Sequence, residues 1–413
     1  MTEAAPRPEL GLSGAGLVTT LCIAQVFVQI GASVWPALLP DMMPRWALTN
    51  SEAGWITAIF LGAYMLAVPV LVPLTDRFDP RYIYLFGVGL TCLGHLLFGL
   101  LAEGFWSALL CRALTGVGWA GTYMTGLKLL ADSVDGRLMS RATAGHAASI
   151  GISGALSFSF ADVLASSFGW PAPFLVAAAS AAIAWLLVVV AVPRRAPVHG
   201  ESNNGRMFDF APVLRNRSAM AYALTYCIHT LEYHAVRGWG VAFLAFVAGT
   251  AGAAGSTFSP ATTLTVLGIL ATLATVIGNE FSIHFGRRRL IAGTLVASMA
   301  CACLMGLAAP HSYIVAITVI LIYGFVISLD SSSLTAGTAG SAEPSRRGAT
   351  LAVHSSLGYA GGFFGPLIVG WTLDASGSWA LAFAAVAACV FCSLVVFSIM
   401  RPRELAGDRF EVK

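Results

Sequence analysis

One apolar segment, residues 218–247, concentrates its polar side chains on a single helical face. At 100° per residue, five of them fall within an arc of roughly 80°: Tyr222, Tyr226, His229, Tyr233 and Arg237. Glu232 lies on the flank of this arc. An arginine can bind an anionic group, whereas a carboxyl and an imidazole can exchange a proton. This face therefore suits a charged solute and a proton, although a static buried ion pair would use the same residue types.

Two other apolar segments repeat the pattern. Segment 106–131 carries Arg112, Thr115, Trp119, Thr122, Tyr123 and Gly126 on one side, and segment 13–39 places Gln25 and Gln29 one turn apart. If these faces meet around a cavity, nine residues are candidates for contact with a solute. They are Gln25, Gln29, Arg112, Trp119, Tyr123, Tyr226, His229, Tyr233 and Arg237.

Depth along the helices suggests a proton site. At 1.5 Å per residue, Glu232 lies roughly 21 Å from the start of its segment at residue 218. Arg112 lies about 9 Å from residue 106, on the opposite side of a hydrocarbon core about 30 Å thick, so the two side chains are at a similar depth and are expected to meet. A carboxylate is drawn toward ionisation by a nearby arginine and toward protonation by burial. We therefore expect Glu232, His229 and Arg112 to form a proton-coupling group.

The composition identifies the elements that must position these residues. The 413-residue chain is 57% hydrophobic and only 10% charged, whereas a soluble protein carries roughly 25% charged residues. This excludes a soluble enzyme and a disordered chain, and it argues against a nucleic-acid partner. The sequence predicts an all-α integral membrane protein whose partner is the lipid bilayer.

Runs of about 20 apolar residues predict twelve transmembrane helices in two six-helix bundles. The expected spans are 13–39, 52–72, 82–102, 106–131, 142–166, 170–193, 218–247, 260–283, 290–309, 312–337, 349–373 and 378–400. The expected domains are a tail (1–12), an N-terminal bundle (13–193), a linker (194–217), a C-terminal bundle (218–400) and a tail (401–413).

Basic residues set the expected orientation. Of the 23 Lys and Arg residues, 19 fall in the tails, the linker and the loops on the same side of the membrane, and Arg45 alone falls in a loop on the other side. By the positive-inside rule, both termini are expected in the cytoplasm, in a bacterial cytoplasmic (inner) membrane. Lys128 is expected to snorkel toward that side.

The remaining chemistry-bearing residues give weaker signals. The eight cysteines lie in apolar runs and are expected to pack, as are His146 and His354. Asp330 either lines an inner vestibule or pairs with a loop arginine. No phosphate-binding loop, metal cluster or nucleophile constellation occurs, so we expect no cofactor, no metal, no catalytic residues and no ATP-driven pumping.

The two halves are related by a shift of about 207 residues. It aligns Ser149-Ile150-Gly151 with Ser356-Leu357-Gly358, and Gln25 with Glu232. Two parallel six-helix repeats joined by a basic linker are an architecture of secondary transporters. The halves are therefore expected to be pseudo-symmetric.

Two motifs carry a resemblance to a known family. The loop Leu74-Thr75-Asp76-Arg77-Phe78-Asp79-Pro80-Arg81 and the span-four sequence Arg112-Ala-Leu-Thr-Gly116-Val-Gly118 resemble motifs of the major facilitator superfamily. The loop motif departs from the family at Val72 and Asp79-Pro80, and its second-half copy has Ile283 in place of the aspartate. The resemblance implies the major facilitator fold and a cavity lined by spans one, four, seven and ten. Charge clamps that break when the halves rock are expected at Asp76, Arg77, Arg81, Asp132, Arg287 and Arg288.

These observations predict a secondary active transporter that moves a small polar or anionic organic solute by alternating access, coupled to protons and functional as a monomer. One alternative is a proton antiporter that exports hydrophobic compounds or lipids, although span five lacks the Gly-Pro signature of such exporters. Another is a transporter-like sensor that binds a solute without moving it.

Overall fold

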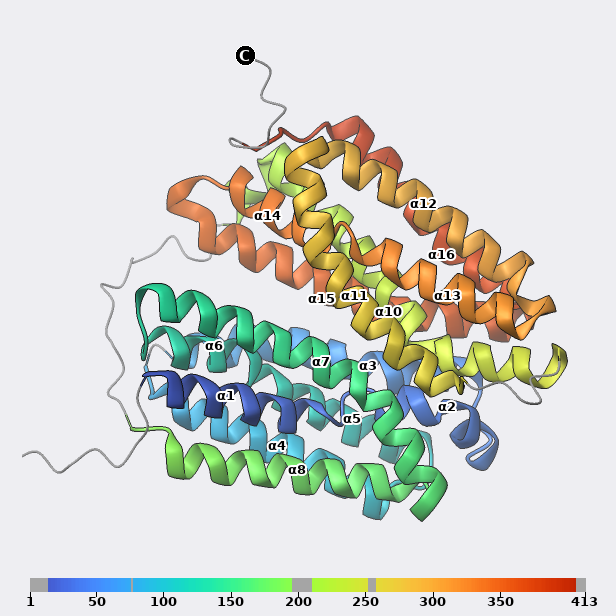
Figure 1. Cartoon of the computed structure of the whole chain (residues 1–413), viewed down its shortest axis with the longest axis horizontal. Helices are drawn as coiled ribbons and strands as arrows, with labels where there is room; N and C mark the ends of the chain where they lie inside the picture. The colour runs from blue at the N-terminus through green and yellow to red at the C-terminus, as the bar shows by residue number, and fades with distance from the viewer. Residues whose placement is uncertain (1–13, 76, 195–209, 252–257, 406–413) are drawn as a thin grey trace, which may run out of the picture.

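The computed structural model describes residues 14–75, 77–194, 210–251 and 258–405. Within these residues, nine helical segments are long and apolar enough to cross a bilayer. Three further long segments, Phe105–Ala131, α10 (Arg217–Ala251) and α15 (Arg347–Ser376), are richer in polar and small residues. Together they make twelve transmembrane helices in two pseudo-symmetric bundles of six (Figure 1). Helices suit the bilayer because their backbone hydrogen bonds are satisfied within the segment.

The N-terminal bundle contains eight helices that form six spans. They are α1 (Gly14–Gln29), α2 (Val34–Arg45), α3 (Asn50–Leu74), α4 (Pro80–Leu101), α5 (Phe105–Ala120), α6 (Tyr123–Ala131), α7 (Gly136–Phe168) and α8 (Pro171–Ala191). Capping sets several boundaries: Thr49 and Glu52 form a capping box before α3, and Asp79 caps α4, which begins with Pro80.

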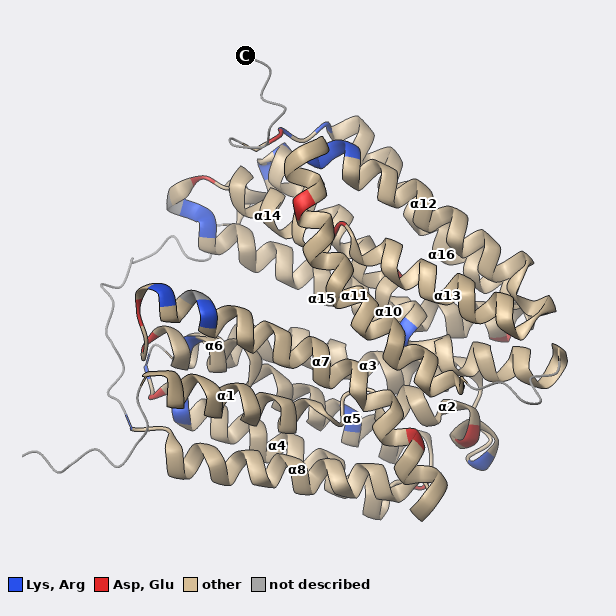
Figure 2. Ribbon diagram, in the orientation of Figure 1, with Lys and Arg blue, Asp and Glu red and all other residues tan. Residues whose placement is uncertain are grey.

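The C-terminal bundle follows a short helix, α9 (Ala211–Arg215), and begins with the long helix α10. Its other helices are α11 (Pro260–Phe285), α12 (Arg287–Leu307), α13 (Tyr313–Ser328), α14 (Ser331–Ser341), α15 and α16 (Trp379–Met400), with single turns at Ala309–His311 and Pro344–Arg346. We call the membrane side where α8 ends and α10 begins the linker end, and the other side the far end. Figure 2 shows Lys and Arg gathered at the linker end of both bundles.

Three spans are interrupted where the sequence predicted continuous helices. The breaks fall at 30–33 between α1 and α2, at 121–122 between α5 and α6, and at 329–330 between α13 and α14. The first span also extends to Arg45, beyond the expected end at residue 39, because α2 accommodates Pro40 and Pro44. A break leaves backbone groups without helical partners, and such backbone is tolerated in a membrane where it faces protein or a cavity.

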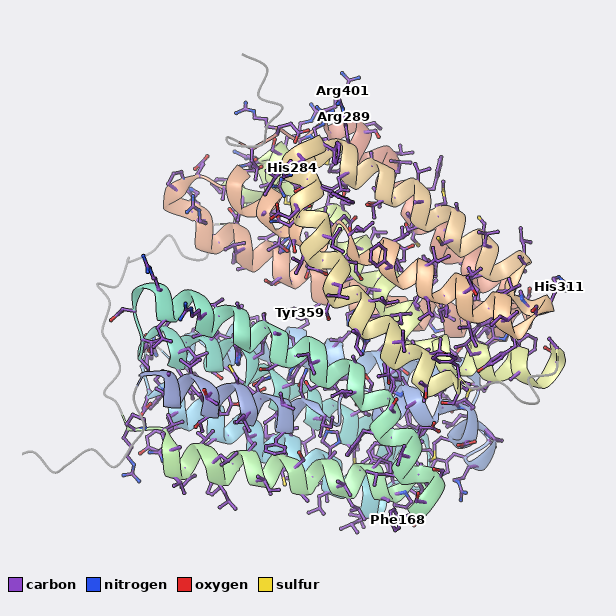
Figure 3. The ribbon with its side chains drawn as sticks, in the orientation of Figure 1. Phe168, His284, Arg289, His311, Tyr359 and Arg401 are labelled. Carbon is purple, nitrogen blue, oxygen red and sulfur yellow. The ribbon has the colours of Figure 1, made fainter. Side chains whose placement is uncertain are left out.

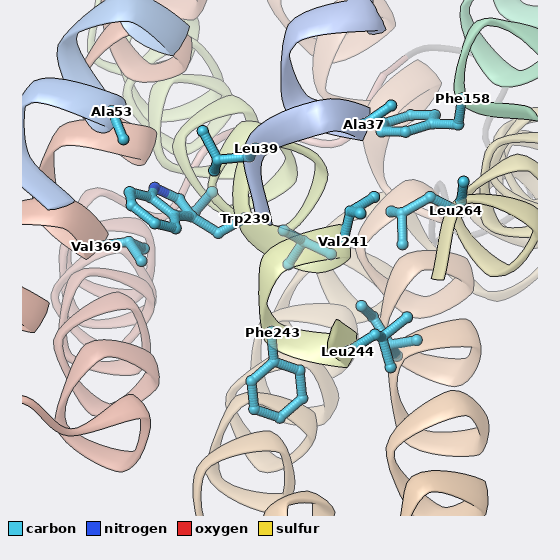
Figure 4. Packing of buried hydrophobic residues seen from close by; sticks show 14 of the residues in the cluster. Ala37, Leu39, Ala53, Phe158, Trp239, Val241, Phe243, Leu244, Leu264 and Val369 are labelled. Carbon is cyan, nitrogen blue, oxygen red and sulfur yellow. The ribbon is translucent and has the colours of Figure 1, made fainter. Parts of the chain in front are cut away.

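A hydrophobic cluster joins the two bundles at the far end. Figure 4 shows Ala37 and Leu39 of α2 and Ala53 of α3 near Trp239 and Val241 of α10. The indole Nε1 of Trp239 also donates a hydrogen bond of 2.9 Å to the Pro366 carbonyl within the C-terminal bundle. This cluster removes apolar surface of both bundles from solvent at the same place, and so it closes the far end.

Close packing and polar contacts strengthen this closure. A Cβ at Gly54 of α3 would lie 2.9 Å from the Pro366 carbonyl oxygen of α15, so the two backbones approach as closely as glycine allows. Ser159 of α7 and Thr265 of α11 share a hydrogen bond of 2.7 Å. In Figure 1 the bundles lie together at the right and diverge toward the left, where the linker end lies.

Asp374, beyond the last residue of the expected span 349–373, links the bundles at the surface of the far end. Its Oδ1 accepts hydrogen bonds from the backbone N–H of Asn50 (2.9 Å) and from the Asn50 amide, and its Oδ2 accepts from the N–H of Ser51 (2.7 Å). These N–H groups open helix α3 and have no partner within it. Desolvation alone would raise the pKa of Asp374, but the hydrogen bonds from Ser51 and Asn50 hold it below its ordinary value.

We predict that Asp374→Ala weakens the far-end closure by about 1 kcal/mol, the usual effect of removing a side-chain cap. Hydrogen–deuterium exchange at the start of α3 should accelerate. Because the folded-state pKa is lowered, the stabilisation is complete above the ordinary pKa and is lost as the pH falls through the lowered value.

Asp41→Ala is the matched control, since Asp41 is an exposed aspartate on α2 at the same end. Unchanged exchange at Asn50 and Ser51 in the Asp374 variant would contradict the assignment of this contact.

Candidate functional site

A cavity of about 190 Å³ lies between the two bundles, on the linker side of the hydrophobic cluster. It is lined by the break between α1 and α2 and by residues of α3, α5, α7, α10 and α15. Five residues predicted from the sequence line it: Gln29, Arg112, Trp119, Tyr233 and Arg237. Two of these are arginines, and the lining contains no aspartate or glutamate among the described residues.

Arg112 of α5 enters the cavity from the N-terminal bundle. It is 2% exposed, its guanidinium lies 4.6 Å from the centre of the Phe60 ring, and its Nη1 is 3.5 Å from the Ala32 carbonyl at the α1–α2 break. Within the described residues, Arg112 has no carboxylate partner. A buried guanidinium held only by a ring and one distant carbonyl has unused hydrogen-bonding capacity, so it is suited to receive an anion.

Arg237 enters from the C-terminal bundle and reaches across to the other one. Its Nη2 donates to the Gly154 carbonyl of α7 (2.7 Å) and to Ser33 Oγ at the α1–α2 break (3.2 Å), while Nη1 donates to the Tyr233 hydroxyl (3.2 Å). The centre of the Phe158 ring lies 5.0 Å from the guanidinium. A single arginine thus joins α10, α7 and the broken first span.

A second cavity, of about 230 Å³, adjoins the first and shares Gly151, Tyr233 and His234 with it. One of its walls is a stack of rings along α10: Tyr226 lies against His229 (centroids 5.6 Å apart), and His229 against Tyr233 (6.4 Å). His354 of α15 extends the stack, 4.0 Å from Tyr226. Hydroxyl-bearing residues line the same cavity, among them Thr272, Ser328 and Ser331.

Glu232 does not meet Arg112, contrary to the expectation from depth alone. Its carboxylate accepts a 2.8 Å hydrogen bond from the Tyr323 hydroxyl of α13, inside the C-terminal bundle. Depth was a poor guide because Glu232 lies on the flank of the polar face of α10, turned toward α13 rather than toward the N-terminal bundle. Glu232 therefore occupies a site separate from the two arginines.

The α13–α14 break brings a second carboxyl group to this region. His229 Nδ1 lies 2.8 Å from Asp330 Oδ1, and both side chains are buried. The loop-arginine interpretation of Asp330 is therefore wrong, since its partner is His229 of α10. His229, Glu232, Asp330 and Tyr323 are buried ionisable side chains that form two close pairs within the C-terminal bundle, and we call them the C-bundle cluster.

The remaining predicted residues fall in three places. Gln25 accepts a 3.2 Å hydrogen bond from the Tyr84 hydroxyl within the N-terminal bundle and lines neither central cavity. Tyr123 stacks on His146, with ring centroids 5.7 Å apart. Tyr222 is turned to the linker end, where its hydroxyl donates to the Arg403 carbonyl.

The predicted charge clamps have the following contacts. Arg81 donates to the Val189 carbonyl, and Asp132 lies 3.5 Å from Lys128. The backbone N–H groups of Arg287 and Arg288 donate to Glu404 in the residues after α16. Arg77 is exposed, and Asp76 lies outside the described residues.

Sequence reasoning assigned no role to Tyr323, expected His354 only to pack, and did not pair Asp330 with His229. A signal existed for His354, because the shift of 207 residues brings His146 to position 353, next to His354, and both rings stack on a tyrosine. Another cross-bundle contact, the 2.9 Å hydrogen bond from the Tyr359 hydroxyl to that of Tyr64, had no such signal. Figure 3 labels Tyr359 where α15 faces the N-terminal bundle.

Comparison with known proteins identifies the architecture. The family model described as Major Facilitator Superfamily matches residues 21–268 and 238–411. Human protein spinster homolog 1 is 25% identical over 238 residues, which cover 55% of this chain, so the match spans about half (45%) of the human protein.

Two solved structures share the fold. The nucleoside transporter NupG superposes with a TM-score of 0.75 at 14% identity, over 94% of this chain and 99% of NupG. A bacterial homologue of the human lysosomal transporter Spinster, in an inward-facing and occupied conformation, gives 0.74 at 16% identity, over 93% of this chain and 94% of the homologue.

We predict that Tyr323→Phe destabilises the protein by about 1–3 kcal/mol, because it removes the 2.8 Å hydrogen bond that the Tyr323 hydroxyl donates to the buried Glu232 carboxyl. The measurement is the Tm in detergent, which should fall. Tyr82→Phe is the control, since Tyr82 is 51% exposed, and should leave the Tm unchanged.

A double-mutant cycle with Glu232→Met, which has no carboxyl or amide oxygen to accept this bond, separates the contact from general loss of packing. The two substitutions should be non-additive, because both remove the same interaction. Additive effects would mean that the hydroxyl and the carboxyl act independently.

Proposed function

This chain belongs to the major facilitator superfamily, and from that premise we propose that it is a secondary transporter that moves a small organic anion by alternating access. The observation that carries the proposal is the cavity between the bundles, which two arginines enter and which no acidic residue lines among those the structure describes. A positively charged cavity in a low-dielectric setting attracts anions and disfavours cations. A carboxylate or phosphoryl group fits the fork of donors that a guanidinium presents.

The ring stack supports a substrate with a larger body beside its anionic group. The second cavity opens from the first through shared residues and is lined by tyrosine and histidine rings and by threonine and serine residues. Such walls accept planar or hydroxyl-bearing groups. We assign the anion to Arg112 and Arg237, and contacts with the body of the substrate to Tyr226, His229 and Tyr233, with Gln29, Trp119 and Tyr123 nearby.

We propose that the linker end faces the cytoplasm, that both termini lie there, and that the protein works as a monomer in a bacterial cytoplasmic membrane. The support is the excess of Lys and Arg at the linker end (Figure 2). With that orientation, the closed far end is the outer side, and the conformation described here faces inward. The Spinster homologue with the same fold was also solved facing inward.

We propose that transport is coupled to protons through the C-bundle cluster. Glu232 is 2% exposed and Asp330 1%, and neither faces an arginine or lysine within the described residues. A buried carboxyl group without an arginine or lysine partner changes its protonation when its surroundings change. His229 belongs to both the cluster and the second cavity. A substrate that contacts His229 in the cavity can therefore change the surroundings of Glu232 and Asp330. In this assignment Arg112 acts through the substrate rather than as a direct partner of Glu232.

For the anion site, we predict that Arg112→Gln and Arg237→Gln each weaken binding of the transported anion by about 10–100-fold, the equivalent of losing a hydrogen bond to a charged group. Uptake into proteoliposomes, screened over small carboxylates and phosphorylated solutes, measures this effect. Arg141→Gln, at an exposed position of α7, is the control and should transport normally.

Selective uptake of a neutral or cationic solute, with full activity in both arginine variants, would contradict the anion proposal. Tight binding without accumulation would instead support a solute sensor.

For the coupling site, we predict that Glu232→Gln abolishes accumulation driven by an imposed pH gradient but retains exchange of labelled for unlabelled solute. Exchange needs the rocking of the bundles, whereas accumulation also needs the release of a proton. Asp330→Asn should have the same effect if the two carboxyl groups share the proton. Undiminished pH-driven uptake in both variants would contradict proton coupling through this cluster.

A further inference from the structure

A large groove lies at the linker end of the C-terminal bundle, well away from the central cavities. Its volume is about 1230 Å³, and it is formed by α9, the first turn of α10, the end of α14, the end of α16 and the residues after α16. Four arginines line it: Arg215, Arg217, Arg401 and Arg403. None of them takes part in the transport site described above.

The positive charge of the groove is not neutralised by its acidic residues. Its two carboxylates have other partners, since Glu404 accepts from the N–H groups that open α12 and Glu343 lies 3.6 Å from Arg346. Within the described residues, the guanidinium groups of Arg215, Arg401 and Arg403 contact no carboxylate.

The groove is held in shape by contacts between distant parts of the chain. The Arg403 N–H donates to Ser218 Oγ (3.0 Å), and the Tyr222 hydroxyl donates to the Arg403 carbonyl (2.8 Å). Arg401 has a left-handed backbone, with φ of 45°, which turns the chain back after α16. A non-glycine residue in this conformation persists only where its surroundings hold it. Residues 401–405 are therefore fixed across the first turns of α10, with Arg401 and Arg403 at the groove.

Two exposed apolar side chains accompany these arginines. Ile399, which lines the groove, is 64% exposed and belongs to the last turn of a membrane-spanning helix. Leu214, which precedes the lining residue Arg215 on the short helix α9, is 57% exposed. An adjoining hollow of about 420 Å³ shares Ser398 and Glu404 with the groove and adds Arg288, Arg289 and the exposed Phe285. Basic residues thus lie at the level where the spans leave the hydrocarbon, directly beside surfaces that face acyl chains.

From this arrangement we propose that the groove binds the phosphate headgroup of an anionic phospholipid. The arginines supply donors for the phosphate, and Ile399 and Leu214 contact the acyl chains. A free phosphate would use the arginines but not the apolar border. Because the groove includes Arg217 and Ser218, the bound lipid would fasten the tail to α10, the helix that carries His229, Glu232 and Arg237.

The test is a lipid titration of the purified full-length protein in detergent, followed by its Tm and by native mass spectrometry. Phosphatidylglycerol should raise the Tm and remain bound, whereas phosphatidylcholine and inorganic phosphate should do neither. Arg215→Gln/Arg401→Gln should weaken phosphatidylglycerol binding about 25-fold, which is about fivefold, or about 1 kcal/mol, for each arginine near the surface.

Arg137→Gln/Arg141→Gln is the matched control, since it removes two exposed arginines from the same end of the N-terminal bundle. It should bind phosphatidylglycerol normally. An equal loss in this control would mean diffuse surface attraction and would overturn the site. Equal stabilisation by phosphatidylcholine would overturn the role of charge, and equal stabilisation by inorganic phosphate would overturn the lipid as its ligand. Because all four positions are exposed, the unliganded Tm of both variants should match that of the parent chain.

Discussion

A buried arginine at the centre of a membrane protein must have partners for its charge, and much of this structure is arranged around two of them. A charged side chain at the centre of a spanning helix costs about 2.5–3.5 kcal/mol even on the most lenient scale. Arg237 meets this cost with the Gly154 carbonyl, Ser33 and the Tyr233 hydroxyl. Arg112 offsets the cost of its burial less completely, because among the described residues it contacts only the Phe60 ring and a distant carbonyl of Ala32. The break in the first span serves both, because it presents a carbonyl to one arginine and a hydroxyl to the other.

In the proposed transport cycle, the same contacts connect anion binding to movement of the bundles. Arg237 joins the bundles through groups that an arriving anion would replace, since a carboxylate or phosphoryl oxygen competes for the same guanidinium N–H groups. Each contact transferred from Gly154 and Ser33 to the anion weakens a link between α10 and the N-terminal bundle. The far end is also closed by the hydrophobic cluster around Trp239, by the close approach at Gly54 and by the cap that Asp374 provides. In this proposed cycle, release of Arg237 is one of several steps toward opening of the far end. It is the step that depends on whether the anion site is occupied.

Much of the fold followed from the sequence, because twelve apolar runs, the placement of basic residues and the internal repeat all depend on local composition. The polar faces of α5 and α10 also followed, and they do line a common cavity. The partners within the site did not follow. A helical wheel places Glu232 on the flank of a face but does not say which neighbouring helix lies there, and Tyr323 is 91 residues away in the chain. The break before α14 was equally hidden, since no proline marks it, and that break is what turns Asp330 toward His229.

The separation of Glu232 from Arg112 changes how the proposed coupling between proton and anion would work. Had they paired, protonation would have released the arginine directly, and the proton and the anion would have competed for one site between the bundles. Instead the carboxyl groups lie within the C-terminal bundle and the arginines lie at its border with the other bundle. The two sites share helix α10, on which His229 contacts Asp330 and lies in the same ring stack as Tyr233, whose hydroxyl accepts from Arg237. Under the proposed proton coupling, the link between proton and anion therefore runs along this face of α10, through the stacked rings of His229 and Tyr233.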